Sequence, residues 1–97
     1  MQTIMPNRTR DFDLEVYRYY QNMCLRCGRW KLLTIHEIVP RSHFGKSGNP
    51  FTIENCVPLC EVCHDWAHRF GTNVSIPELT QRQAEWEKLH GKYTFKS

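Results

Sequence analysis

The sequence lacks long apolar runs. No stretch reaches the roughly 18 consecutive apolar residues that a membrane-spanning helix requires, so we expect no membrane association. The opening residues, MQTIMPNRTRDFD, lack the apolar core of a secretory signal peptide. We therefore expect an intracellular protein.

Internal repeats and low-complexity tracts are also missing, and 97 residues suit one domain, residues 1–97. The hydrophobic content of 40% argues against a disordered chain. A domain of this size buries a modest core and often needs a metal or a disulfide to stabilise it.

Cysteine, by contrast, is abundant. Four of the five cysteines form two Cys-x-x-Cys pairs, Cys24 with Cys27 and Cys60 with Cys63. In an intracellular chain such pairs indicate metal rather than disulfides. Four thiolates predict a closed, tetrahedral structural zinc site, whose removal should cost much of the fold. Cys56 lies outside both pairs, and we interpret it as a small buried side chain.

The chain between the two pairs predicts a hairpin followed by a helix. Residues 30–39 are rich in β-branched and apolar side chains and predict a strand, with a return strand within residues 51–59. Residues 60–69 predict a helix that ends at Gly71. A zinc knuckle, a hairpin and a helix that begins at the second pair form a treble clef, with a core at about residues 24–70.

Two flanking helices complete the predicted α+β fold. Apolar residues at helical spacing predict one helix at about residues 11–23. A second helix is predicted at about residues 76–90, with Ser75 as its cap and Glu78 closing a capping box.

A second cluster of possible metal ligands lies beside the zinc site. His64 and His68 are four residues apart, so a helix places both imidazoles on one face. His36 lies across the hairpin. A histidine pair alone is more often a surface coincidence, but the three together predict an open site for a catalytic divalent ion (Mg²⁺, Mn²⁺, Ni²⁺ or Zn²⁺).

The runs IHEIVPRS (residues 35–42) and ENCVPLCEVCHDWAH (residues 54–68) resemble the HNH endonucleases. The resemblance covers about residues 24–68 and implies the ββα-metal fold and phosphodiester hydrolysis in DNA, most simply duplex DNA. It also implies a bacterial or bacteriophage origin, and hence the cytoplasm of a bacterial or phage-infected cell. A homodimer or a larger phage or bacterial complex is compatible with it.

Transferred residue by residue, the resemblance makes His36 and His64 metal ligands, and His68 a third ligand or a histidine near the phosphate. Asn55 resembles the middle Asn, which orients the loop and the base or ligates the metal. Glu37 stands where the family usually has its general-base histidine. Either Glu37 is the base, or His36 is the base with Glu37 or Asn55 as a ligand, or the enzyme is slow or inactive.

Strand alternation sends His36 and Glu37 to opposite faces, and both can face the helix only if the strand is bulged or twisted. His43, in the loop, is a further candidate for the missing histidine, although a solvated loop histidine or a phosphate contact is the simpler interpretation.

Basic residues gather around the predicted site. The net charge is +3, and residues 26–46 contain five basic side chains and one acid. Candidates for phosphate contacts are Arg41, Lys46 and Arg69. The competing hypothesis is a non-catalytic treble-clef module that binds nucleic acid or protein. Such a module needs the four cysteines but not the three histidines, so we favour the enzyme.

Overall fold

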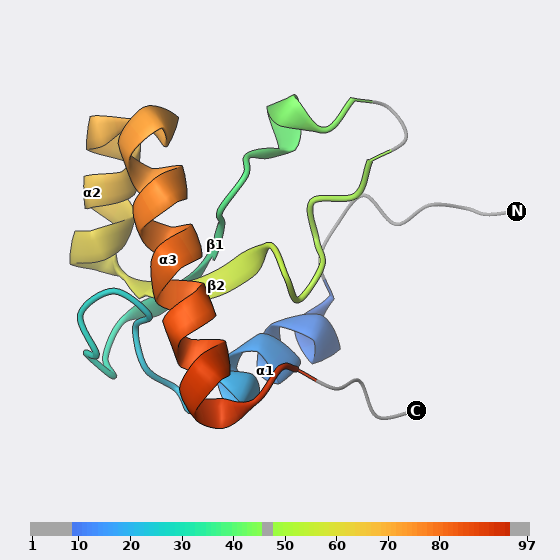
Figure 1. Cartoon of the computed structure of the whole chain (residues 1–97), viewed down its shortest axis with the longest axis vertical. Helices are drawn as coiled ribbons and strands as arrows, with labels where there is room; N and C mark the ends of the chain where they lie inside the picture. The colour runs from blue at the N-terminus through green and yellow to red at the C-terminus, as the bar shows by residue number, and fades with distance from the viewer. Residues whose placement is uncertain (1–8, 46–47, 94–97) are drawn as a thin grey trace, which may run out of the picture.

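The computed structural model describes residues 9–45 and 48–93. These residues form a small α+β domain of three α-helices and a two-stranded sheet (Figure 1). The elements are α1 (Arg10–Tyr19), β1 (Leu33–Glu37), the 3₁₀ helix η1 (Arg41–His43), β2 (Cys56–Cys60), α2 (Glu61–Phe70) and α3 (Thr72–His90). Within the described ranges, no helix is both long and apolar enough to cross a membrane. The predicted fold class, a zinc-stapled ββα-metal domain with flanking helices, is confirmed.

The sheet is a regular antiparallel pair. Its register runs without interruption from Leu33 opposite Cys60 to Glu37 opposite Cys56. Every residue of β2 is buried, because α1 packs on this strand and α2 continues from it. The segment between the strands extends away from α2 and α3 and carries η1 (Figure 1). The hairpin therefore has a buried base at the cysteines and an open end near His36 and Glu37.

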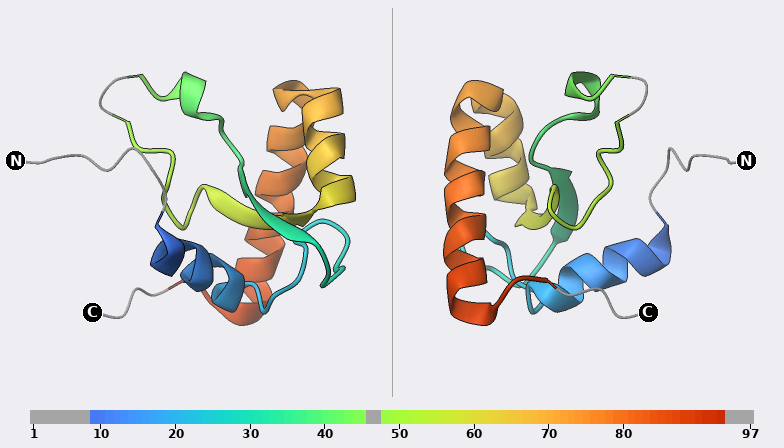
Figure 2. Two further views of the ribbon diagram at one scale, coloured as in Figure 1. Left: turned by 180° about the vertical axis from the view of Figure 1, so that it is seen from behind. Right: turned by 45° about the vertical axis from the view of Figure 1, so that its right-hand side comes forward.

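Helix α2 follows β2 without a connecting loop. Cys60 is both the last residue of β2 and the N-cap of α2, so strand and helix meet at a predicted zinc ligand. Gly71 ends α2 at a φ of 81°, a value that glycine adopts without a steric cost. The chain then reverses into α3, which lies beside α2 in all views (Figures 1 and 2). Ala67 of α2 and Leu79 of α3 are both buried and belong to the hydrophobic core.

The predicted start of the last helix was wrong. Helix α3 begins at Thr72, and Ser75 is a buried residue of its first turn whose N–H donates to the carbonyl of Gly71 at 2.9 Å. Gly71 reverses the chain so tightly that α3 starts directly after it, and no cap is needed at Ser75. Glu78, the expected partner in a capping box, instead pairs with the arginines Arg26 and Arg82.

Helix α1 closes the bottom of the domain. It is capped by Thr9, whose hydroxyl accepts from the N–H of Phe12 at 3.1 Å. It ends at Tyr19, before the expected residue 23, because Gln21 and Asn22 have φ values of 56° and 57° that a right-handed helix excludes. The Tyr19 hydroxyl donates to the carbonyl of Gly91 at 2.6 Å, which ties α1 to the end of α3 (Figure 2).

Candidate metal centres

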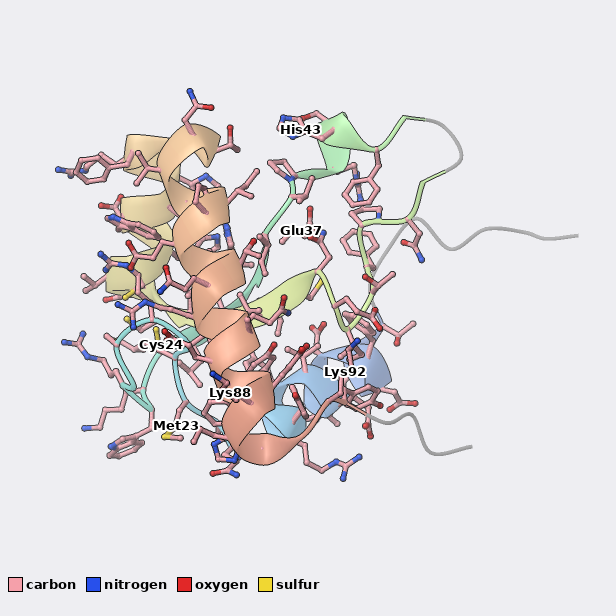
Figure 3. The ribbon with its side chains drawn as sticks, viewed as in Figure 1. Met23, Cys24, Glu37, His43, Lys88 and Lys92 are labelled. Carbon is pink, nitrogen blue, oxygen red and sulfur yellow. The ribbon has the colours of Figure 1, made fainter. Side chains whose placement is uncertain are left out.

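The four paired cysteines converge at the base of the hairpin. Their sulfur atoms all lie within 4.8 Å of one another. The first pair lies in a tight knuckle, in which the N–H of Cys27 faces Sγ of Cys24 at 3.5 Å and Gly28 takes a φ of 83°. Cys24 lies below the N-terminal end of α2 in Figure 3. Four sulfur donors in a closed cluster fit a structural zinc ion.

The electrostatics of this cluster also fit a cation. Burial raises the pKa of Cys63 to about 12, and the neighbouring cysteines add to the effect. Burial also acts on Cys60, but hydrogen bonds from the Cys63 backbone and the neighbouring thiols outweigh it and lower the pKa of Cys60 to about 7. A positive charge among the sulfurs would oppose the effect that raises the pKa of Cys63, as a bound metal ion does for a coordinating thiol.

Sequence reasoning missed Arg26, which it counted only as one basic residue. One guanidinium N–H of Arg26 points at Sγ of Cys63 at 3.7 Å, and another donates to Glu78 at 2.8 Å. The guanidinium also lies over the ring of Trp66, 3.8 Å from its centroid. Arg26 thus links the zinc knuckle to both α2 and α3. The position of Arg26 between Cys24 and Cys27 could have indicated a role near the zinc site. Its partners could not be inferred from the sequence, because they are far from it along the chain.

The three histidines predicted as ligands of the second ion come together between β1 and α2. One ring nitrogen of each lies within 4.8 Å of the others, and the rings of His36 and His64 have centroids 5.1 Å apart. They line a pocket of about 280 Å³. The lining residues are Ile35, His36, Glu37, Pro40, His64 and His68. His68 is exposed, so the pocket is accessible from solvent.

His36 is the buried member of this cluster. Its side chain is 8% exposed, and Nε2 has no hydrogen-bond partner among the described residues. Burial, and then the proximity of His64 and His68, lower the pKa of His36 to about 4, so the ring is neutral at pH 7. A buried neutral imidazole with an unpartnered nitrogen is the state in which histidine binds a metal ion. The histidine cluster therefore fits a divalent cation.

Comparison with known proteins agrees with this arrangement. The family model described as HNH endonuclease matches residues 23–70, which contain both clusters. These residues belong to the HNH endonuclease family. No curated protein and no solved structure gives a significant match. Membership of the family implies a nuclease-type function and a nucleic-acid substrate.

Glu37 departs from the HNH pattern and is the last residue of β1. The uninterrupted register of β1 contains no bulge, so the Glu37 and His36 side chains leave the strand on opposite faces. Glu37 nevertheless lines the pocket, at the end of β1 and below η1 in the view of Figure 3. Among the described residues, its carboxylate is not one of the clustered ligand atoms.

Asn55 of the HNH domain is buried and its amide is occupied. Its Oδ1 accepts from the N–H of Val39 at 2.9 Å, and its Nδ2 donates to the carbonyls of Val39 and Pro50, each at 3.0 Å. These bonds join both ends of the segment that connects the strands. The Asn55 amide therefore holds the segment between the strands in place.

The candidate phosphate contacts surround the pocket unevenly. Arg41 is exposed on η1, with its guanidinium 5.3 Å from the ring centroid of Phe51. Arg69 is exposed next to His68 and forms a loose 3.4 Å ion pair with Asp65. Lys46 lies outside the described residues. His43 is an exposed residue of η1, above Glu37 in Figure 3, and is not part of the histidine cluster.

Thr34 is the other residue that sequence reasoning missed. Its Oγ1 lies 2.8 Å from Nδ1 of His64 and donates to the carbonyl of Leu59 at 3.0 Å. Strand alternation was the available signal, because Thr34 and His36 are two residues apart and share a face of β1.

Proposed function

We propose that this HNH domain is a metal-dependent endonuclease that hydrolyses phosphodiester bonds in duplex DNA. The observation that carries the proposal is the buried, unpartnered Nε2 of His36 beside the rings of His64 and His68. Leaving a buried polar nitrogen without a partner costs about 1–3 kcal/mol, a cost that a bound cation would offset. A non-catalytic treble clef requires the cysteines but gives no reason for this arrangement.

The three histidines would hold the ion, and the cysteine cluster would fix the helix that carries two of them. A bound divalent cation supplies Lewis-acid stabilisation of a scissile phosphate oxygen and of the leaving 3′ oxygen. The exposed position of His68 leaves that side of the pocket accessible to a phosphate.

We propose Glu37 as the general base that takes a proton from the attacking water. Glu37 is the acidic residue among those that line the pocket, and its side chain leaves β1 on the face opposite the His36 ring. Because the Glu37 side chain and the His36 ring lie on opposite faces of β1, we favour Glu37 as the base and not as a ligand of the ion that His36 would hold. The alternative, in which His36 is the base and Asn55 a ligand, conflicts with the three hydrogen bonds that already occupy the Asn55 amide.

Contacts to the substrate backbone are assigned to exposed arginines beside the pocket. Arg41 follows the lining residue Pro40, and Arg69 follows His68. Such contacts give affinity without sequence choice. Because the described residues of this small domain form one histidine cluster, a double-strand cut would need two domains or two encounters. Nicking is the expected first product.

Supercoiled plasmid tests this function directly. Protein loaded with one equivalent of zinc is incubated with Mg²⁺, Mn²⁺, Ni²⁺ or EDTA, beside the His64→Ala variant. His90→Ala is the matched control, because His90 is an exposed histidine that stacks on Trp86, outside the cluster. We expect nicking that requires added metal, persists in His90→Ala and is lost in His64→Ala. Retention of plasmid on a gel without cutting under any ion would favour the binding module.

Glu37→Gln tests the base separately. The substitution keeps the size of the side chain and removes its ability to accept a proton. Cleavage should fall by roughly 10²–10⁴-fold, while Ni²⁺ affinity measured by calorimetry stays unchanged. If the variant instead lost Ni²⁺ binding, Glu37 would be a metal ligand. If the variant cleaved DNA as fast as the wild type, Glu37 would not be the base, and His36 would be the remaining candidate.

A further inference from the structure

Thr34 forms a direct polar contact between β1 and His64, the first histidine of α2. It is half-buried, and its hydroxyl lies 2.8 Å from Nδ1 of His64. The same hydroxyl lies 3.0 Å from the carbonyl oxygen of Leu59. Leu59 is fully buried and is the register partner of Thr34 across the sheet. The position of the hydroxyl is therefore fixed by the sheet.

The two contacts of this hydroxyl differ in what they permit. A threonine hydroxyl has one proton to donate, and a carbonyl oxygen can only accept. The Leu59 carbonyl therefore takes the Thr34 proton. Toward His64 the hydroxyl then acts as an acceptor, so Nδ1 of His64 must be the protonated nitrogen. In the neutral ring this leaves the lone pair on Nε2.

We propose that Thr34 is a positioning residue that fixes the tautomer and the ring orientation of His64, and so makes Nε2 its metal-binding nitrogen. Metal-ligating histidines commonly depend on such a partner at their second nitrogen. The proposal deepens the proposed function, because it names the group that prepares one ligand of the same site.

The placement of Thr34 also links the two clusters. Its hydroxyl is anchored to the carbonyl of Leu59, the residue directly before the cysteine ligand Cys60. His64 directly follows Cys63. Both partners of the hydrogen bond are therefore held by residues adjacent to the structural cluster, and the His64 ring is oriented before any catalytic ion arrives.

The tautomer can be measured without a catalytic ion. Protein labelled with ¹⁵N-histidine and loaded with one equivalent of zinc is studied by long-range ¹H–¹⁵N correlation at about pH 7.5, above the ordinary histidine pKa of about 6.5. We expect His64 to be protonated on Nδ1. In Thr34→Val, which keeps the shape and removes the hydroxyl, the signal should move toward a mixture of tautomers. Thr34→Ser should restore the wild-type signal.

Metal affinity gives a second readout. Calorimetric titration with Ni²⁺ should show a loss of about 10–100-fold in Thr34→Val and near wild-type binding in Thr34→Ser. Thr80→Val, on the exposed side of α3, is the matched control and should change neither readout. Retention of the structural zinc in each variant shows that the fold is intact.

Two results would overturn the proposal: His64 protonated on Nε2 in the wild-type protein, or wild-type tautomer and Ni²⁺ affinity in Thr34→Val. Neither depends on cleavage. A protein that shows the expected tautomer and Ni²⁺ response but cuts no DNA would refute the nuclease and leave the assignment of Thr34 standing.

Discussion

Replacing Asn55 by alanine should destabilise the domain through the segment between the two strands. The substitution removes three hydrogen bonds, one from the N–H of Val39 and two to the carbonyls of Val39 and Pro50. At about 1 kcal/mol each, their loss lowers the free energy of unfolding by about 3 kcal/mol. For a domain of this size that corresponds to a fall in Tm of about 12–24 °C. Pro50 is buried, so without Asn55 its carbonyl keeps only the weak thiol donor of Cys56 at 3.5 Å and is not reached by water without local opening.

Urea unfolding of zinc-loaded protein, followed by circular dichroism, measures this effect. Asn55→Asp keeps the acceptor for Val39, loses both donors and turns a buried carboxylate toward two carbonyl oxygens, so it should cost more than the roughly 2 kcal/mol of the two lost bonds. Asn73→Ala, at an exposed position of α3, is the matched control and should stay within about 0.5 kcal/mol of wild type.

A metal titration shows whether Asn55 stabilises the segment between the strands or binds the metal ion. If Asn55→Ala unfolded at the wild-type urea concentration but lost Ni²⁺ affinity at the histidines, Asn55 would be a ligand and the hydrogen-bond argument would be refuted. The expected result is the reverse, a less stable protein whose folded fraction still binds Ni²⁺.

Three further outcomes follow from the contacts of the two clusters. Removal of zinc with a chelator, or the Cys27→Ser substitution, should abolish most of the helical signal in far-UV circular dichroism, because α2 begins at a cysteine of the cluster. A metal-free protein that stays helical would contradict a structural role for zinc. The Arg26→Ala substitution removes the contacts to Cys63 and Glu78 and should weaken zinc binding by about 10-fold, as measured by competition with a chromogenic chelator. Arg29 is exposed, so Arg29→Ala is the control and should leave zinc affinity unchanged. The pKa of His36 is lowered from 6.5 to about 4, so between these values the unfolded chain binds a proton that the folded domain excludes. Stability of the domain without a catalytic ion should therefore fall as pH drops from 6.5 toward 4, and the difference in urea midpoint between wild type and His36→Gln should change across that window; parallel pH profiles would contradict the burial argument.

Several features followed from the sequence alone because they depend on local spacing. The two Cys-x-x-Cys pairs predict a four-sulfur cluster, and the period of a helix places His64 and His68 on one face. The ββα-metal fold and the HNH family were predicted from the same motifs and are confirmed. The burial of Cys56 was also predicted correctly, because a cysteine outside the two Cys-x-x-Cys pairs behaves as a small core side chain.

The helix ends show where local patterns stop being sufficient. The residues around Ser75 match the pattern of a capping box, yet α3 starts earlier, directly after Gly71. Glu78 instead accepts a hydrogen bond from Arg26, which is 52 positions away in sequence. Whether Glu78 closes a capping box or forms an ion pair depends on which side chains pack beside it in the folded domain. A local sequence pattern does not contain that information.

The sequence by itself determined which side chains can bind metal, because ligand chemistry belongs to the residue types and their local spacing. Only the tertiary structure decided which nitrogen of His64 faces the Thr34 hydroxyl, that Nε2 of His36 is buried without a partner among the described residues, and that the Asn55 amide bonds to Val39 and Pro50. These properties arise from contacts between segments far apart in the chain, such as the 30 positions between Thr34 and His64. Such contacts form only when the sheet and the helices pack together, and that packing sets the hydrogen bonds and the burial on which the chemistry depends.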